Sequence, residues 1–243
     1  MHGSATARRA HRQLRHRAGI VLLAAMACLD VPSASGQAAP ATGTVTGQVT
    51  LTTRMRGVPI ATNAYAPRAV THQGAPTAPE MRSVVVYLKD GRHSGPLDPS
   101  RAEIRQEAES FVPRVVAVTR GSTVDFPNFD PYFHNVFSLS RVGTFDLGRY
   151  ATGQSRSRRF DKAGLVKVYC HLHSQMSATI LVLDHPYFAT PAADGRFTLP
   201  QVPPGDYILA GWHERVGEQT VRISVKAGTI TTTNLSLPVE DAR

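Results

Sequence analysis

Hydrophobic and polar residues alternate with a period of two along several short stretches of this chain. In residues 44–51, valine, glycine and leucine alternate with threonine and glutamine. In a later stretch, Val166, Val168 and Cys170 fall on one face, while a lysine and a tyrosine fall on the other. This alternation is typical of a strand with one buried face. The valine-rich residues 83–88, closed by Lys-Asp-Gly, predict a further strand and turn.

The last quarter of the chain has the same short-strand organisation. Asp194-Gly195 is a strong hairpin signal, and Pro-Pro-Gly-Asp at 203–206 is another tight turn. Between and after these turns we expect strands at residues 197–199, 207–210, 220–225 and 230–237. Residues 62–82 are rich in alanine, proline and threonine and predict a long surface loop. Because no segment after the N-terminal region has a long helical period, we expect an all-β fold with turns at β-sandwich spacing.

The N-terminus has the order of regions found in a cleavable secretory signal. Five arginines precede the apolar residues 18–29, and small residues follow at 34–36. We therefore expect residues 1–36 to be a signal peptide, the mature protein to be periplasmic or otherwise exported, and no transmembrane segment to remain after cleavage. Cys28 is an alternative site for a lipid anchor, but the leucine usual three residues before such a cysteine is missing.

The net charge of the whole chain, +9, overstates the charge of the mature protein. Removing residues 1–36 takes away five arginines and one aspartate, which leaves about +5. The mature chain has no block of lysines and arginines, so nucleic-acid binding is not expected. An acidic protein partner is compatible with this mild positive charge.

Cysteine use points to a metal. Cys170 is the one cysteine left after cleavage, and a single thiol in an oxidising compartment cannot form an intramolecular disulfide. His173 and Met176 follow it closely, and we expect His134 to come from a separate loop at the same end of the sandwich. One thiolate, two imidazoles and a thioether are the ligands of a trigonal copper centre with a weak axial methionine. Zinc is disfavoured because a thioether is a poor zinc ligand.

The motif Cys170-x-x-His173-x-x-Met176, preceded by Phe-His134-Asn135-Val, resembles the cupredoxins. It is most similar to the amicyanin branch and to plastocyanin-like proteins labelled as methylamine-utilisation proteins. The resemblance implies a Greek-key sandwich over residues 102–184 that holds one type 1 copper ion. By the same resemblance, the amide of Asn135 ties the His134 loop to the Cys170 loop and so orients the ligands.

Two neighbours of Cys170 bear on catalysis. His171 follows the cysteine, and such a neighbour generally points away from the metal, so we do not expect it to be a ligand. Multicopper oxidases and copper nitrite reductases resemble this loop but have a histidine immediately before the cysteine, where this chain has Tyr169. We therefore expect no enzyme activity from this chain alone.

The flanking segments resemble a different family. Residues 43–49, 83–88, 194–209 and 220–237 are similar to the carboxypeptidase-regulatory or transthyretin-like sandwich. This resemblance implies that residues 43–90 and 187–238 form one sandwich, into which the copper domain is inserted. Such an insertion is physically easy because the termini of a compact domain usually lie close together.

These observations predict an exported single-electron carrier that exchanges electrons transiently with redox partner proteins. Leu172 and residues 131–133 are expected to form an apolar docking patch. One alternative is copper acquisition, storage or delivery through the same ligands. A second is attachment to an envelope protein or polysaccharide, with an accessory copper site.

Overall fold

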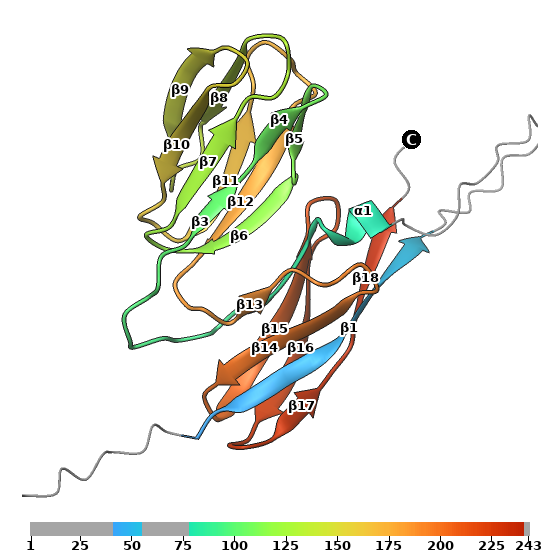
Figure 1. Cartoon of the computed structure of the whole chain (residues 1–243). Helices are drawn as coiled ribbons and strands as arrows, with labels where there is room; N and C mark the ends of the chain where they lie inside the picture. The colour runs from blue at the N-terminus through green and yellow to red at the C-terminus, as the bar shows by residue number, and fades with distance from the viewer. Residues whose placement is uncertain (1–40, 55–77, 241–243) are drawn as a thin grey trace, which may run out of the picture. The chain divides into compact units, whose positions relative to one another are not determined.

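The computed structural model describes residues 41–54 and 78–240, and these residues form an all-β protein (Figure 1). The all-β prediction is therefore confirmed. The predicted signal peptide with Cys28, and residues 62–77 of the predicted loop, lie outside the described residues. Residues 78–81 were expected in that loop but form a short helix, α1 (Ala78–Met81). None of the helices in the described part is long and apolar enough to cross a membrane.

Strands from the middle of the chain form what we call the inner sandwich. One sheet has the order β6-β12-β11-β8-β9, and the other has the order β10-β7-β3. The hairpin β4-β5 lies beside them. The strands are β3 (Arg101–Glu103), β4 (Arg105–Glu107), β5 (Ser110–Val112), β6 (Val115–Thr119), β7 (Thr123–Pro127), β8 (His134–Ser138), β9 (Phe145–Tyr150), β10 (Ser155–Arg159), β11 (Gly164–Tyr169) and β12 (Ser177–Leu183).

The core of the inner sandwich follows from the alternation along its strands. Val166 and Val168 of β11 point inward and are fully buried, together with Val124 and Phe126 of β7. Strand β12 is paired on both sides, with β6 and β11, and it is apolar almost throughout, as expected for a central strand. The same core cluster contains Cys170 and lies next to the candidate ligands.

Strands from the beginning and the end of the described chain form what we call the outer sandwich. In one sheet β1 pairs with β14, β17 and β18, and the other sheet has the order β13-β2-β15-β16. The strands are β1 (Gly43–Arg54), β2 (Val84–Leu88), β13 (Phe188–Ala189), β14 (Arg196–Val202), β15 (Gly205–His213), β16 (Gly217–Val225), β17 (Ile230–Thr232) and β18 (Leu235–Glu240). The transthyretin-like resemblance and the domain boundaries stay predictions.

One strand expected in this region is divided in the structure. Residues 230–237 were expected to form one strand but form β17 and β18, which both pair with β1 in parallel. Thr233 and Asn234 separate these two strands and also bond to β1. The N–H of Thr233 donates to the Thr46 carbonyl, and the side chain of Asn234 accepts the N–H of Gln48.

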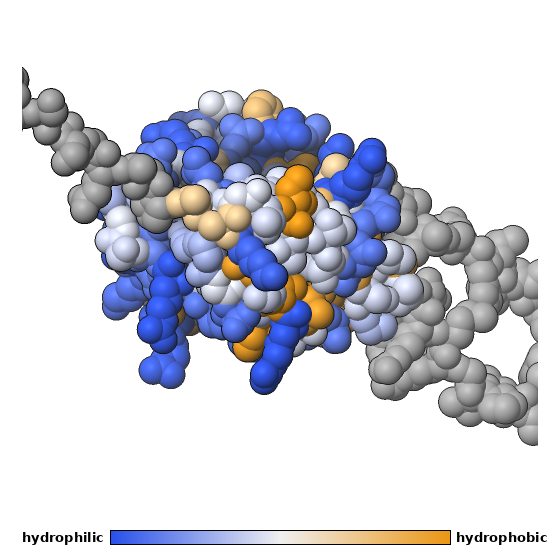
Figure 2. Space-filling model, turned by 90° about the horizontal axis from the view of Figure 1, so that it is seen from below, coloured by the Kyte–Doolittle hydropathy of each residue, from blue (hydrophilic) through white to orange (hydrophobic). Residues whose placement is uncertain are grey.

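On the face shown in Figure 2, hydrophobic residues form small groups within a mostly hydrophilic surface.

Candidate metal centre

The structure brings together three of the four predicted ligands. His134 begins β8, Cys170 follows the last residue of β11, and His173 lies in the loop that leads to β12. Strands β8 and β11 pair in antiparallel, with Tyr169 opposite Phe137, so the chain that follows β11 runs back along β8 toward His134. The Cys170 Sγ atom and one nitrogen of each histidine all lie within 4.8 Å of one another.

The separations of these donor atoms fit a single metal ion. Cys170 Sγ is 3.9 Å from His134 Nδ1 and 4.0 Å from His173 Nδ1, and the two Nδ1 atoms are 3.1 Å apart. Metal–nitrogen bonds of about 2.0 Å and metal–sulfur bonds of about 2.3 Å place the ligands of one ion roughly 3–4 Å apart. Three electron-rich atoms that converge in this way are stabilised by a cation between them. The residues present therefore fit a metal with one thiolate and two imidazole ligands.

Burial shields this donor set from water unevenly. His134 is fully buried and Cys170 is 5% exposed, whereas His173 is only partly buried. Met176, the predicted axial ligand, is also buried, and it belongs to the same core cluster as Cys170. Its backbone N–H donates to the His173 carbonyl, which closes the loop tightly between these two residues. Axial ligation by Met176 stays a prediction.

The side-chain amide of Asn135 links β8 to the loop that carries Cys170, and its role near a metal stays a prediction. Its Oδ1 accepts a hydrogen bond of 3.3 Å from the backbone N–H of His171, and its Nδ2 donates to Asp146 Oδ1 at 2.6 Å. The ring of His171 stacks on Phe137 with centroids 3.7 Å apart, and His171 is not part of the donor cluster. The chain segment that follows Cys170 is thus fastened to β8.

Sequence reasoning missed Asp130. Its Oδ2 lies 2.8 Å from His134 Nε2, and its carboxylate also accepts the backbone N–H groups of Ala108 and Glu109. Burial raises the pKa of the Asp130 carboxyl, but these three donors stabilise the anion and together hold its pKa below the ordinary value. The spacing of four residues from His134 was the available signal. It was hidden in a Pro-Asn-Phe-Asp-Pro stretch that is typical of an ordinary turn.

Exposed apolar side chains lie close to the candidate ligands along the chain, and Tyr132 also lies close to His173 in space. Phe133 is 60% exposed and Leu172 is 39% exposed, and both are neighbours of candidate ligands in the chain. The Tyr132 ring lies 6.4 Å from the rings of both His134 and His173. We call Tyr132, Phe133 and Leu172 the exposed apolar patch.

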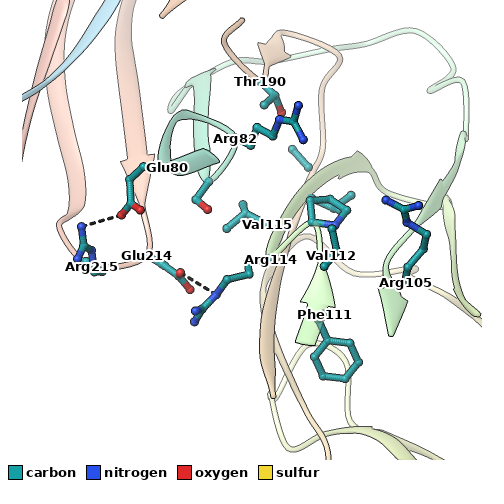
Figure 3. Close-up of a pocket in the computed structure, with 14 residues that line it drawn as sticks. Glu80, Arg82, Arg105, Phe111, Val112, Arg114, Val115, Thr190, Glu214 and Arg215 are labelled. Atoms are coloured by element: carbon teal, nitrogen blue, oxygen red, sulfur yellow. Dashed lines mark ion pairs between the residues drawn. The ribbon is translucent and has the colours of Figure 1, made fainter. Parts of the chain in front are cut away.

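A separate pocket of about 880 Å³ contains none of the predicted ligands (Figure 3). Two ion pairs, Glu80–Arg215 at 2.7 Å and Arg114–Glu214 at 3.1 Å, lie along its wall. Phe111 of β5 also lines it. Within the described residues, the cluster of His134, Cys170 and His173 is the one group with metal-ligand geometry.

Comparison with known proteins gives matches among solved structures alone. No family model matches the chain, and no curated protein matches it. A copper-containing nitrite reductase from Thermus scotoductus is 24% identical, with a TM-score of 0.34, and the match covers 37% of this chain and 24% of that chain. This chain therefore spans about a quarter of the length of the nitrite reductase.

Two smaller proteins match a similar share of the chain. A mutant of amicyanin in the Cu(I) form is 20% identical, with a TM-score of 0.32, over 33% of this chain and 80% of that chain. A purple cupredoxin from Nitrosopumilus maritimus is 24% identical, with a TM-score of 0.31, over 34% of this chain and 99% of that chain. Each is a protein to which about a third of this chain is similar, and the candidate centre is defined by the chain's own residues.

Proposed function

We propose that this chain is an exported electron carrier that holds one type 1 copper ion through His134, Cys170 and His173, with Met176 as the axial ligand. The observation that carries the proposal is the convergence of one buried sulfur and two imidazole nitrogens within 4.8 Å. This donor set, with a methionine near it in the chain, favours copper over zinc and over hard cations that prefer oxygen.

When bound, copper supplies the Cu(II)/Cu(I) couple, and the protein supplies a rigid, dry ligand frame. Cys170 and His134 are fixed by adjacent strands, and Asn135 bonds the backbone next to Cys170. Ligands held in this way need little rearrangement when the metal charge changes. A small rearrangement favours rapid electron exchange, and burial keeps water away from the thiolate.

His173 and the exposed apolar patch are the proposed route for electrons. His173 is the least buried of the three cluster residues. Tyr132 lies close to it, and Phe133 and Leu172 are exposed neighbours of the candidate ligands in the chain. A small apolar surface suits the weak, short-lived contacts that redox partners make. On this proposal the partners are redox proteins outside the cytoplasm, and the chain alone is not an enzyme.

Burial of the ligands favours electron transfer over copper delivery. A protein that delivers copper has to open its site to an incoming ligand, and here His134 is fully buried and Cys170 nearly so. Retention of the metal through repeated redox changes is therefore the property that separates the two functions.

The test is to cycle the copper-loaded mature protein between oxidant and reductant in the presence of a colourless Cu(I) chelator in tenfold excess. We expect full recovery of the visible absorbance after each of several cycles, with copper remaining on the protein. Progressive transfer of copper to the chelator in the reduced state would contradict the carrier function and support delivery. Leu139→Asp is the control variant, and it should retain copper as the wild type does. Leu139 is exposed and follows the end of β8, whereas His134 begins that strand.

A further inference from the structure

We infer that Asp130, held by the tip of the β4–β5 hairpin, is the positioning residue that orients the ligand His134 and favours the oxidised form of the metal. The inference rests on the proposed copper function for its redox part, whereas its orienting part concerns the metal-free protein. It starts from the 2.8 Å contact between Asp130 Oδ2 and His134 Nε2.

The contact fixes which ring nitrogen of His134 faces the metal. An ionised carboxylate accepts hydrogen bonds and has none to donate, so the bond requires a proton on His134 Nε2. Neutral imidazole then has a bare lone pair on Nδ1, and this is the atom that lies 3.9 Å from Cys170 Sγ. Asp130 is 5% exposed and His134 is fully buried, so water does not compete strongly for either group. His134 is thereby set for metal binding before any metal arrives.

The hairpin tip fixes the carboxylate in turn. The N–H of Ala108 donates to Asp130 Oδ1 at 2.7 Å, and the N–H of Glu109 donates to Oδ2 at 2.9 Å. Both residues have a φ of 52°, as in the two-residue turns that glycine and asparagine usually occupy. Alanine and glutamate are strained in this conformation. The bonds to Asp130 offset that strain, which explains why the turn can hold two such residues.

The same tip also contacts the other ligand loop. Gln175, which lies between His173 and Met176, donates from its Nε2 to Glu109 Oε2 at 2.9 Å. The backbone N–H of Phe129, next to Asp130, donates to the Gln106 carbonyl of β4 at 2.9 Å. The β4–β5 hairpin thus braces both segments that carry candidate ligands.

A carboxylate bonded to a ligand imidazole makes that ligand more electron-rich. The added negative charge is stabilising for Cu(II) relative to Cu(I), so it lowers the reduction potential. Asparagine at position 130 keeps the size of the side chain and removes the charge. Asp161→Asn is the matched control, since Asp161 is an exposed carboxylate of the same sandwich that pairs with Arg159.

The first measurement is made on the metal-free protein in mildly alkaline solution, by nitrogen NMR of the imidazole rings and by amide hydrogen exchange. We expect His134 to carry its proton on Nε2, and the amides of Ala108 and Glu109 to exchange slowly. In Asp130→Asn both amides should exchange at least tenfold faster, and in Asp161→Asn neither should change. A wild-type His134 protonated on Nδ1, or amide protection independent of Asp130, would overturn the orienting role.

The second measurement is the reduction potential of the copper-loaded proteins. Asp130→Asn should shift the Cu(II)/Cu(I) equilibrium about tenfold toward Cu(I), a rise of about 59 mV for one electron. A shift of less than twofold, or an equal shift in Asp161→Asn, would overturn the redox role. If the wild-type protein develops no thiolate-to-copper absorbance while its His134 tautomer is as expected, the copper function fails and the orienting role of Asp130 stands.

Discussion

The inner and outer sandwiches differ in what they bury. The main core cluster of the outer sandwich consists of aliphatic and aromatic side chains, such as Leu199 and Leu209. The inner sandwich buries Asp130, His134 and Asn135 where β8 begins, next to Cys170. A buried polar group destabilises a fold unless it is bonded, and a purely apolar end would give stability more simply. The β8 end of the inner sandwich therefore departs from purely apolar packing at the residues of the candidate site.

The outer sandwich also buries a histidine, His213. It is fully buried in the outer sandwich, and burial lowers its pKa, but it is not part of any donor cluster among the described residues. Burial of a histidine alone therefore does not mark a site. A nearby carboxylate does not mark a site either, because Glu80 Oε1 lies 3.4 Å from His213 Nε2. What distinguishes His134 is the Cys170 thiol near its Nδ1.

The largest expected effect on stability comes from the apolar core of the outer sandwich. Leu209 is fully buried there, so Leu209→Ala should lower the free energy of unfolding by about 2–5 kcal/mol. The absorbance spectrum of the copper-loaded folded protein should not change, because Leu209 lies in the other core. Chemical unfolding and spectra of the same samples check both parts. A changed copper spectrum in the folded variant would mean that the two sandwiches are not separate in function.

The exposed apolar patch gives the next largest effect, on electron exchange rather than stability. Phe133→Asp should slow electron self-exchange between oxidised and reduced copies about tenfold, which corresponds to about 1.4 kcal/mol. The charge would repel a second copy that approaches through the same surface. NMR line broadening measures this rate, and Leu139→Asp is the control for an added charge elsewhere. Equal slowing in both variants would place the exchange route elsewhere.

A partly exposed ion pair in the outer sandwich, between Lys89 and Glu218, predicts a smaller, pH-dependent effect. Burial raises the pKa of Glu218, but hydrogen bonds from Lys89 and Tyr87 lower it by a larger amount. The folded pKa of Glu218 therefore lies below the ordinary value. A depressed carboxyl pKa stabilises the fold above the unfolded pKa, and this stability is lost as the pH falls through the folded value.

Glu218→Gln should therefore lower the free energy of unfolding by about 1 kcal/mol near neutral pH, after allowance for partial exposure. The difference from the wild type should vanish in strongly acidic solution, below the folded pKa. Unfolding by urea at both pH values measures it. A difference that persists in acid would assign the effect to packing instead of charge.

The smallest effect concerns the strained hairpin turn of the inner sandwich. Ala108→Gly should raise the free energy of unfolding by about 0.5 kcal/mol, because glycine adopts positive φ without strain but loses more entropy on folding. Ala102→Gly in β3 is the control, and it should lower stability by about 0.5–1 kcal/mol. Destabilisation of similar size in both variants would show that the turn is not strained.

The sequence was sufficient for the all-β class because short alternating stretches and turn residues act locally. It did not indicate β9 and β10, since all five residues of β10 are exposed and no hydrophobic alternation marks that strand. Strand β10 exists because it pairs with β7 over five residues, and pairing of that kind depends on a distant segment. Exposed edge strands are thus the part of the fold that periodicity alone cannot find.

The candidate ligands could be proposed from sequence because three of them lie within seven residues of one another, at Cys170, His173 and Met176. Asp130 could not, because its role depends on the backbone of a hairpin some twenty residues earlier in the chain. In the sequence, a carboxylate between turn residues looks the same whether it caps a loop or bonds to a metal ligand.

On the proposed function, a single thiolate, Cys170, and two imidazoles hold one copper ion. The most direct measurement is the visible and electron paramagnetic resonance spectrum of the mature protein with one equivalent of Cu(II), beside Cys170→Ser and His171→Gln. We predict an intense thiolate-to-copper band with a narrow hyperfine pattern that is retained in His171→Gln and lost in Cys170→Ser. A pale, broad-hyperfine signal that survives Cys170→Ser would place copper on other histidines and rule out the proposed thiolate site.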